Sequence, residues 1–183
     1  MTLDERYESV VREPSDIQAH LPLLRILASE SSRVVEFGVR TGISTVALLA
    51  GRPKWMRSYD IEPFAEADEL RAMAPETDWQ FIQADDMQIE PHPLVDLFFI
   101  DTLHTAGQLW VELDRHARFA SKIVLHDTVL FGWKGENGER GLNFAIVEFL
   151  KWWPAWSVIY ESVESCGLLI LERKFGGVFC SIS

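Results

Sequence analysis

The sequence has few cysteines, no excess of basic residues and no long apolar run, and each absence argues against a class of protein. Two cysteines, Cys166 and Cys180, in 183 residues are too few for a disulfide framework, so both are expected to be reduced thiols. The formal net charge of −11 argues against broad electrostatic binding to nucleic acid or to an anionic membrane surface. No stretch approaches the ~18 consecutive apolar residues that a membrane-spanning helix needs.

The first residues do not predict a secretion signal. Asp4 and Glu5 stand where a signal peptide has a basic start, and no apolar stretch follows them. We therefore expect a cytoplasmic protein. The composition, with 48% hydrophobic and 25% charged residues, is that of an ordinary globular protein, and residues 1–183 have a natural length for one domain.

The spacing of apolar residues predicts alternating strands and helices. Residues 1–14 are polar, show no clear period and end at Pro14, so no element is predicted there. A helical series runs from Ile17 to Ala28, and Pro22 is a point at which it would divide. The predicted strands are 33–39, 56–61, 79–83, 95–100, 122–125, 157–161 and 168–172, and the predicted helices are 42–50, 64–73, 105–119 and 142–151.

This alternation predicts an α/β fold of the Rossmann-like, doubly wound type, with helices on both faces of a mostly parallel seven-stranded sheet. A short polar turn joins the last two strands, so the last strand is expected to be antiparallel. The chain then divides into a helical lead-in (1–32), a ligand-binding core (33–130), a glycine-rich loop (131–141) and a C-terminal helix with edge strands (142–183). Ligands of such folds bind beyond the carboxyl ends of the strands, so polar residues there are candidates for the site.

The first strand ends in the sequence EFGVRTGIS, residues 36–44. A dinucleotide-binding turn needs glycine at its first, third and sixth positions, and counted from Gly38 the last two are Arg40 and Ile43. A nicotinamide-dependent oxidoreductase is therefore disfavoured, although it remains an alternative. A ligand with an amino-acid tail could instead place its ammonium group against Glu36.

The second and third strands end in acidic residues. Asp60 follows Gly38 at close to the ~20-residue spacing at which an acid binds ribose hydroxyls. Asp60 could equally cap the next helix, and Glu62 is then the second candidate for the ribose. Asp85 and Asp86 follow the third strand and could bind ligand or cap a helix.

The fourth and fifth strands end in IDTLH, residues 100–104, and LHDT, residues 125–128. Adjacent parallel strands would bring Asp101 and Asp127 together, with imidazoles nearby. Two carboxylates suit a hard cation such as Mg²⁺. The candidate metal ligands are Asp101, His126 and Asp127.

The run at residues 36–44 resembles the first motif of class I S-adenosylmethionine (SAM)-dependent methyltransferases. The strings VDLFFIDTLH (95–104) and IVLHDT (123–128) look like those of small-molecule O-methyltransferases. More narrowly, they are similar to the branch of macrocin and mycinamicin O-methyltransferases and the cephalosporin-biosynthesis proteins grouped with them. The resemblance covers about residues 33–130.

The resemblance implies SAM as cofactor, with Asp101 and Asp127 at metal-ligand positions. His126 stands where the narrower relatives often carry an acid, and His104 stands where catechol-type relatives carry a lysine base. The cofactor-binding residues it implies are Glu36, Gly38, Arg40, Gly42, Ser44, Asp60, Asp85 and Asp101. Such methyltransferases place an acid or its neighbours after the third strand around the adenine, which is the contact implied for Asp85.

We therefore expect methyl transfer from SAM to a hydroxyl of a small molecule such as a sugar or natural product, assisted by a divalent metal. His104 and Asp101 are the predicted catalytic residues, with His104 as general base. His104 could instead cap the helix starting near Thr105 or bond Asp101. The partner is a small-molecule acceptor, and a homo-oligomer is left open. The alternatives are a non-catalytic SAM-binding module, an oxidoreductase and an N-methyltransferase.

Overall fold

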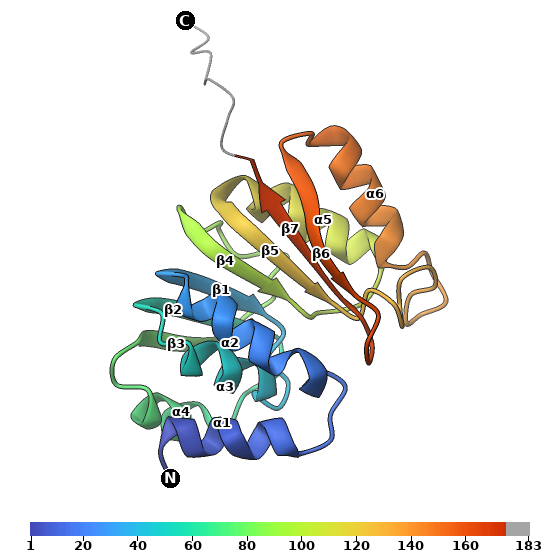
Figure 1. The fold of residues 1–183 in the computed structure, drawn as a ribbon. Coiled ribbons are helices and arrows are strands. Elements are labelled where there is room, and N and C mark those ends of the chain that lie inside the picture. The colour runs from blue at the N-terminus through green and yellow to red at the C-terminus, as the bar shows by residue number, and fades with distance from the viewer. Residues whose placement is uncertain (175–183) are drawn as a thin grey trace, which may run out of the picture.

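The computed structural model describes residues 1–174, which build seven strands into one sheet (Figure 1). The strand order is β3-β2-β1-β4-β5-β7-β6; β1 to β5 are parallel, and β7 pairs antiparallel with both β5 and β6. The predicted fold class is confirmed, including the antiparallel last strand. The strands are β1 (Arg33–Phe37), β2 (Trp55–Asp60), β3 (Asp78–Gln83), β4 (Val95–Ile100), β5 (Ala120–His126), β6 (Trp156–Ser162) and β7 (Leu168–Arg173).

Helices cover both faces of the sheet (Figure 1). One face carries α1 (Leu3–Arg12), α2 (Leu21–Ser29), α3 (Ile43–Ala50) and α4 (Ala67–Met73), and the other carries α5 (Ala106–His116) and α6 (Leu142–Trp152). Short 3-10 turns at Gln18–His20 and Ala117–Phe119 precede α2 and β5. None of the helices in residues 1–174 is long and apolar enough to span a membrane.

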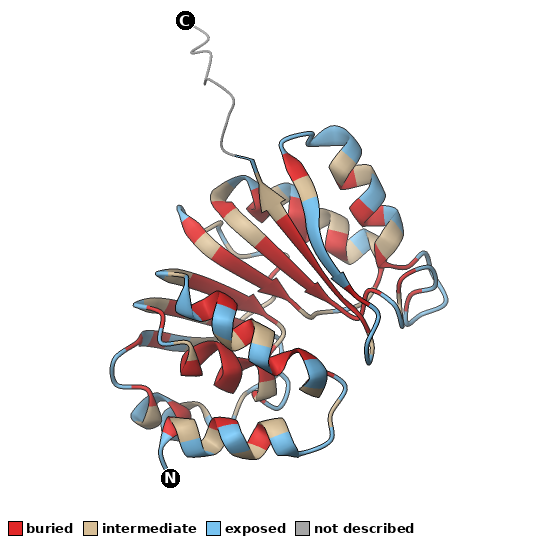
Figure 2. Ribbon diagram, viewed as in Figure 1, coloured by how far each residue is buried: buried red, intermediate tan, exposed pale blue. Residues whose placement is uncertain are grey.

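The central strands are buried because helices pack on both sides of them (Figure 2). Successive side chains of a strand point to opposite faces. In β4, Leu97 and Phe99 pack towards the face of α1 to α4, whereas Phe98 and Ile100 pack towards α5 and α6. This two-sided burial accounts for the nearly continuous apolar run of β4.

The N-terminal segment differs from the prediction, because residues 1–14 include the helix α1. Thr2 and Glu5 form a capping box, each side chain bonding the other residue's backbone N–H. Leu3, Tyr7 and Val10 are the three buried residues of α1. Only one narrow stripe of this helix is apolar, so its period is weak in the sequence.

Two other expectations concern Pro22 and the two cysteines. Pro22 stands in the first turn of α2 and follows the 3-10 turn, so the division of the lead-in at this residue is confirmed. Cys166, in the turn between β6 and β7, is a free thiol, whereas Cys180 lies outside the described residues.

Candidate active site

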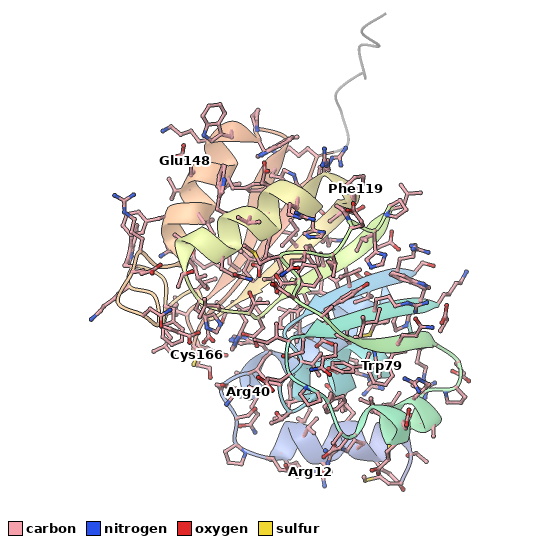
Figure 3. The ribbon with its side chains drawn as sticks, turned by 180° about the vertical axis from the view of Figure 1, so that it is seen from behind. Arg12, Arg40, Trp79, Phe119, Glu148 and Cys166 are labelled. Carbon is pink, nitrogen blue, oxygen red and sulfur yellow. The ribbon has the colours of Figure 1, made fainter. Side chains whose placement is uncertain are left out.

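The loops that follow β1, β4 and β5 meet at one end of the sheet, called here the carboxyl edge. Arg40, after β1, and Cys166, in the β6–β7 turn, lie at this edge, and Phe119, which precedes β5, lies at the opposite end (Figure 3). The backbones approach closely at Gly38, whose φ is +86°. A Cβ there would lie 1.9 Å from the backbone oxygen of Asp101. Only glycine therefore fits where β1 passes β4.

The turn between β1 and α3, residues 38–42 (the glycine turn), contains a second glycine in the left-handed region. Gly42 has φ +77° and is the N-cap of α3, with no side chain capping the helix. The first N–H groups of an uncapped helix remain available to an anionic ligand. This arrangement fits the carboxylate of an amino-acid tail.

Asp60, at the end of β2, binds the glycine turn. Its Oδ2 accepts hydrogen bonds from the backbone N–H groups of Val39 and Arg40, both at 2.8 Å, and its Oδ1 accepts one from Glu62 at 2.9 Å. Asp60 does not cap α4, whose N-cap is Glu66. The carboxylate fixes the shape of the turn, and its predicted contact with ribose stays a prediction.

Glu36 is fully buried beneath the same turn. Its two carboxylate oxygens accept hydrogen bonds from the hydroxyls of Ser44 at 2.7 Å and Thr45 at 2.9 Å, in the first turn of α3. Burial raises the pKa of Glu36 to about 7, against the lowering effect of its hydroxyl partners. An ammonium group brought beside Glu36 would favour the ionised form, as the predicted cofactor contact requires.

Glu36→Gln is expected to make the protein more stable at pH 8, by up to about 3 kcal/mol. An acid whose pKa is raised from 4.5 to about 7 on folding keeps its proton in the folded state while the unfolded chain has lost it. Stability therefore falls as pH rises between these two values. Urea unfolding of both proteins from pH 5 to pH 8.5 checks this, and a stability difference that does not change with pH would contradict it.

Four side chains at the carboxyl edge form what we call the Asp–His cluster: Asp101, His104, His126 and Asp127. His104 Nε2 lies 3.1 Å from Asp101 Oδ1 and 2.9 Å from Asp127 Oδ2. His126 Nδ1 lies 3.3 Å from Asp101 Oδ1 and 3.5 Å from Asp127 Oδ2. The predicted proximity of the two aspartates is thus observed, since both contact the same two imidazoles.

The individual side chains of the Asp–His cluster are ionised in this arrangement. Burial lowers the pKa values of His104 and His126, but the hydrogen bonds and charges of Asp101 and Asp127 outweigh it and raise them to about 10 and about 9. Burial likewise raises the pKa of Asp127, and the two histidines outweigh it and hold that pKa far below its usual range. At neutral pH two imidazolium ions therefore neutralise the two carboxylates.

The glycine-rich loop contributes a residue that the sequence did not single out. Glu136 Oε1 accepts hydrogen bonds from the Nδ1 of His104 and, at 3.2 Å, from its backbone N–H. The His104 ring also stacks on Phe131, with centroids 4.8 Å apart. Thr105, and not His104, caps α5. The sequence feature that could have indicated Glu136 as a site residue is its position among the glycines and charged residues of this loop.

Of the two acids after β3, Asp85 lies in a turn and Asp86 is buried. Asp85 accepts hydrogen bonds from the Met87 backbone at 3.0 Å and the Gln88 side chain at 2.7 Å. Asp86 faces Gln108 and Glu112 of α5, and burial, followed by the hydrogen bond with Asp86 and the charge of Asp86, raises the pKa of Glu112 well above its usual value. The predicted adenine contact of Asp85 is not tested by this geometry.

Arg40 lies apart from the Asp–His cluster. Its guanidinium pairs with Asp16 at 2.8 Å, its side chain is 78% exposed, and its φ is +50°. The backbone oxygen of Asp16 also accepts a hydrogen bond from the Ser165 hydroxyl at 2.7 Å. The lead-in therefore bridges the glycine turn and the β6–β7 turn, and the predicted cofactor contact of Arg40 stays a prediction.

Comparison with solved structures identifies the fold. TomG, an O-methyltransferase of tomaymycin synthesis from Streptomyces achromogenes solved with SAM, has a TM-score of 0.66 at 16% identity, covering 94% of this chain and 89% of that one. An O-methyltransferase from Bacillus cereus solved with S-adenosylhomocysteine (SAH) gives 0.63 at 17% identity, covering 94% and 90%. NodS, an N-methyltransferase from Bradyrhizobium japonicum solved with SAH, gives 0.64 at 15% identity, covering 96% and 100%.

These likenesses establish that the chain has the Rossmann-like fold that these methyltransferases share. No protein-family model matches the sequence, and a search of curated proteins finds no match. Because a fold hosts many activities, the function has to be argued from the site.

Proposed function

We propose that the protein transfers the methyl group of SAM to a hydroxyl of a small molecule, such as a sugar or natural product, with a divalent cation at the Asp–His cluster. The observation that carries the proposal is this cluster, located at the carboxyl edge beside the glycine turn. The fold supports it because the similar structures of TomG and the Bacillus cereus enzyme are O-methyltransferases solved with SAM or SAH. The narrower likeness to macrocin and cephalosporin-type proteins is part of the same proposal.

The glycine turn would hold the methionine end of the cofactor. The free N–H groups at the start of α3 suit its carboxylate, and Glu36 suits its ammonium. Gly38 and Gly42 bring the backbone close, while Asp60 and Asp85 are assigned to the ribose and the adenine. Asp101 connects the glycine turn with the Asp–His cluster. Its side chain is part of the cluster, and its backbone N–H donates a hydrogen bond at 2.9 Å to the carbonyl of Phe37, the residue before the turn.

Methyl transfer is an in-line displacement at an activated sulfonium, so the protein must align the acceptor and remove its proton. Asp101 and Asp127, with one of the two imidazoles of the cluster, would hold the cation, which when bound lowers the pKa of a coordinated hydroxyl, and the other imidazole would accept the hydroxyl's proton. The imidazolium protons of the cluster have to leave before such an ion enters. Acceptor would reach the cluster beside the glycine-rich loop, which already contacts His104 through Glu136.

The ribose assignment gives a prediction. Asp60→Ala should weaken SAH binding by about 1–3 kcal/mol, since it leaves buried polar partners unpaired. It should also lower the melting temperature, because the turn loses its acceptor for the N–H groups of Val39 and Arg40. Calorimetric titration with SAH measures the affinity. If Glu62→Ala weakens binding and Asp60→Ala does not, the ribose contact belongs to Glu62.

The function itself is tested by incubating the full-length protein with SAM, Mg²⁺ or Mn²⁺, and a panel of hydroxylated small molecules, and measuring SAH released. Acceptor-dependent SAH supports the proposal. Retention of NADH without retention of SAM would replace it with an oxidoreductase. SAM binding without turnover on any acceptor supports a non-catalytic binding module, and turnover on amines alone supports N-methylation, the activity named for NodS.

A further inference from the structure

The imidazole closest to both carboxylates is that of His104. Asp101, His104 and Asp127 each offer one ligand atom, and these three atoms lie within 4.8 Å of one another. The sequence had paired the two aspartates with His126 instead. A single nitrogen, His104 Nε2, faces oxygens from the ends of two strands, at 3.1 and 2.9 Å.

The opposite side of the His104 ring is held as in a metal-binding histidine. Such histidines almost always donate the N–H of their second ring nitrogen to a carboxylate or carbonyl, which fixes the tautomer and the orientation of the ring. His104 Nδ1 contacts Glu136, and the stack on Phe131 fixes the plane of the ring. The remaining nitrogen, Nε2, is thereby directed at Asp101 and Asp127.

A second observation points to a ligand at the same place. The Asp127 side chain is only 8% exposed, and its Oδ1 is buried without a hydrogen-bond partner among the described residues. The backbone of Asp127 has φ +59°, a conformation that is uncommon outside glycine and concentrates at functional sites. Asp127 therefore contacts both imidazoles through Oδ2 and keeps Oδ1 as a buried oxygen without a hydrogen-bond partner, available to a ligand.

We propose that His104, oriented by Glu136, is the nitrogen ligand of a cation site completed by Asp101 and Asp127, and that this site prefers a borderline transition ion such as Co²⁺, Fe²⁺ or Zn²⁺ over Mg²⁺. Imidazole suits these ions, whereas Mg²⁺ takes oxygen ligands and keeps its water. This assignment replaces the general-base role of His104, because a coordinated Nε2 is not free to take a proton. It rests on the proposed function only for the ion's use in methyl transfer.

Calorimetry on the metal-stripped, full-length protein tests the assignment, with Co²⁺ and Mg²⁺ titrated separately and no cofactor present. We expect Co²⁺ to bind at one site at least ~10-fold more tightly than Mg²⁺. His104→Gln should weaken Co²⁺ binding by roughly 10–100-fold and reduce its preference over Mg²⁺, and Glu136→Gln should weaken it by about 10-fold. Glu139→Gln, an exposed carboxylate of the same loop, is the matched control and should bind as the wild type does.

Equal affinity for the two ions, unchanged Co²⁺ binding in His104→Gln, or loss of Co²⁺ binding in His126→Gln but not in His104→Gln would overturn the assignment. A readout without substitution covers the case in which a variant misfolds. Pulsed electron paramagnetic resonance of the Mn²⁺-loaded wild type should show coupling to a coordinated imidazole nitrogen, and its absence would also overturn the assignment.

These measurements separate the two proposals. Nitrogen ligation with a Co²⁺ preference, but no SAH release on any acceptor, refutes methyl transfer alone. SAH release in a protein that prefers Mg²⁺ refutes the nitrogen ligand alone.

Discussion

His104→Ala is expected to lower the turnover rate by roughly 10²–10⁴-fold while leaving SAH affinity within a factor of about two. The reason holds whether His104 binds the cation or takes the proton, because its Nε2 faces both carboxylates of the site. The glycine turn, which the cofactor would contact, is unaffected. Initial rates of SAH release with an acceptor found by screening, and calorimetry with SAH, measure the two quantities.

His92→Gln is the control for this substitution. Its ring packs edge-on against Trp55, with centroids 5.1 Å apart, and contacts the Tyr59 hydroxyl, and among the described residues it makes no contact with the Asp–His cluster. It should keep near-normal turnover. A His104→Ala enzyme with wild-type rates would remove His104 from the mechanism, and full activity in excess chelator would remove the metal.

Gly38→Ala should cost about 3–5 kcal/mol of folding free energy, and the melting temperature should fall by roughly 10 °C or more. Alanine at φ +86° is strained, and its Cβ would lie 1.9 Å from a backbone oxygen, so β1 or β4 would have to move. This movement would also displace Asp101, because the backbone oxygen that the Cβ would meet belongs to Asp101. Thermal unfolding measures the first effect, and SAH affinity of the folded fraction measures the second.

Gly107→Ala is the matched control, because nothing lies within 4 Å of a Cβ at this helical position. It should leave the melting temperature unchanged or raise stability by up to ~1 kcal/mol, as alanine is the better helix former. If Gly38→Ala and Gly107→Ala are equally stable, the close approach of Gly38 to the backbone of Asp101 is wrong.

The central strands could be predicted because burial on both faces makes β1, β4, β5 and β7 largely apolar. The boundaries 95–100 of β4 were predicted as observed, and the polar turn before Leu168 indicated the antiparallel hairpin. The helix α1 was missed, because only Leu3, Tyr7 and Val10 are buried in it. Its capping box, Thr2 with Glu5, was a usable signal that the apolar period did not supply.

The site was predictable as far as strand ends determine it. Adjacent parallel strands bring Asp101 and Asp127 together in any fold of this class. Both imidazoles face both acids, and which of them lies closer depends on the left-handed backbone of Asp127 and on Glu136, 32 residues from His104. Neither follows from local spacing, so the sequence assigned His126 to the metal and His104 to the proton.

The bridge at Asp16 has a consequence for the order in which the chain assembles. Ser165 bonds Asp16 across 149 residues, and Arg40 bonds the same residue from the glycine turn. Contacts so distant in sequence form late in folding, because the intervening chain must first be ordered. In a ribosome-bound chain from which β6 and β7 have not yet emerged, β1 to β5 could already pair. The contact of Ser165 with Asp16 at the carboxyl edge would still be missing. Ligand-binding competence should therefore arrive after secondary structure, with the last strands synthesised.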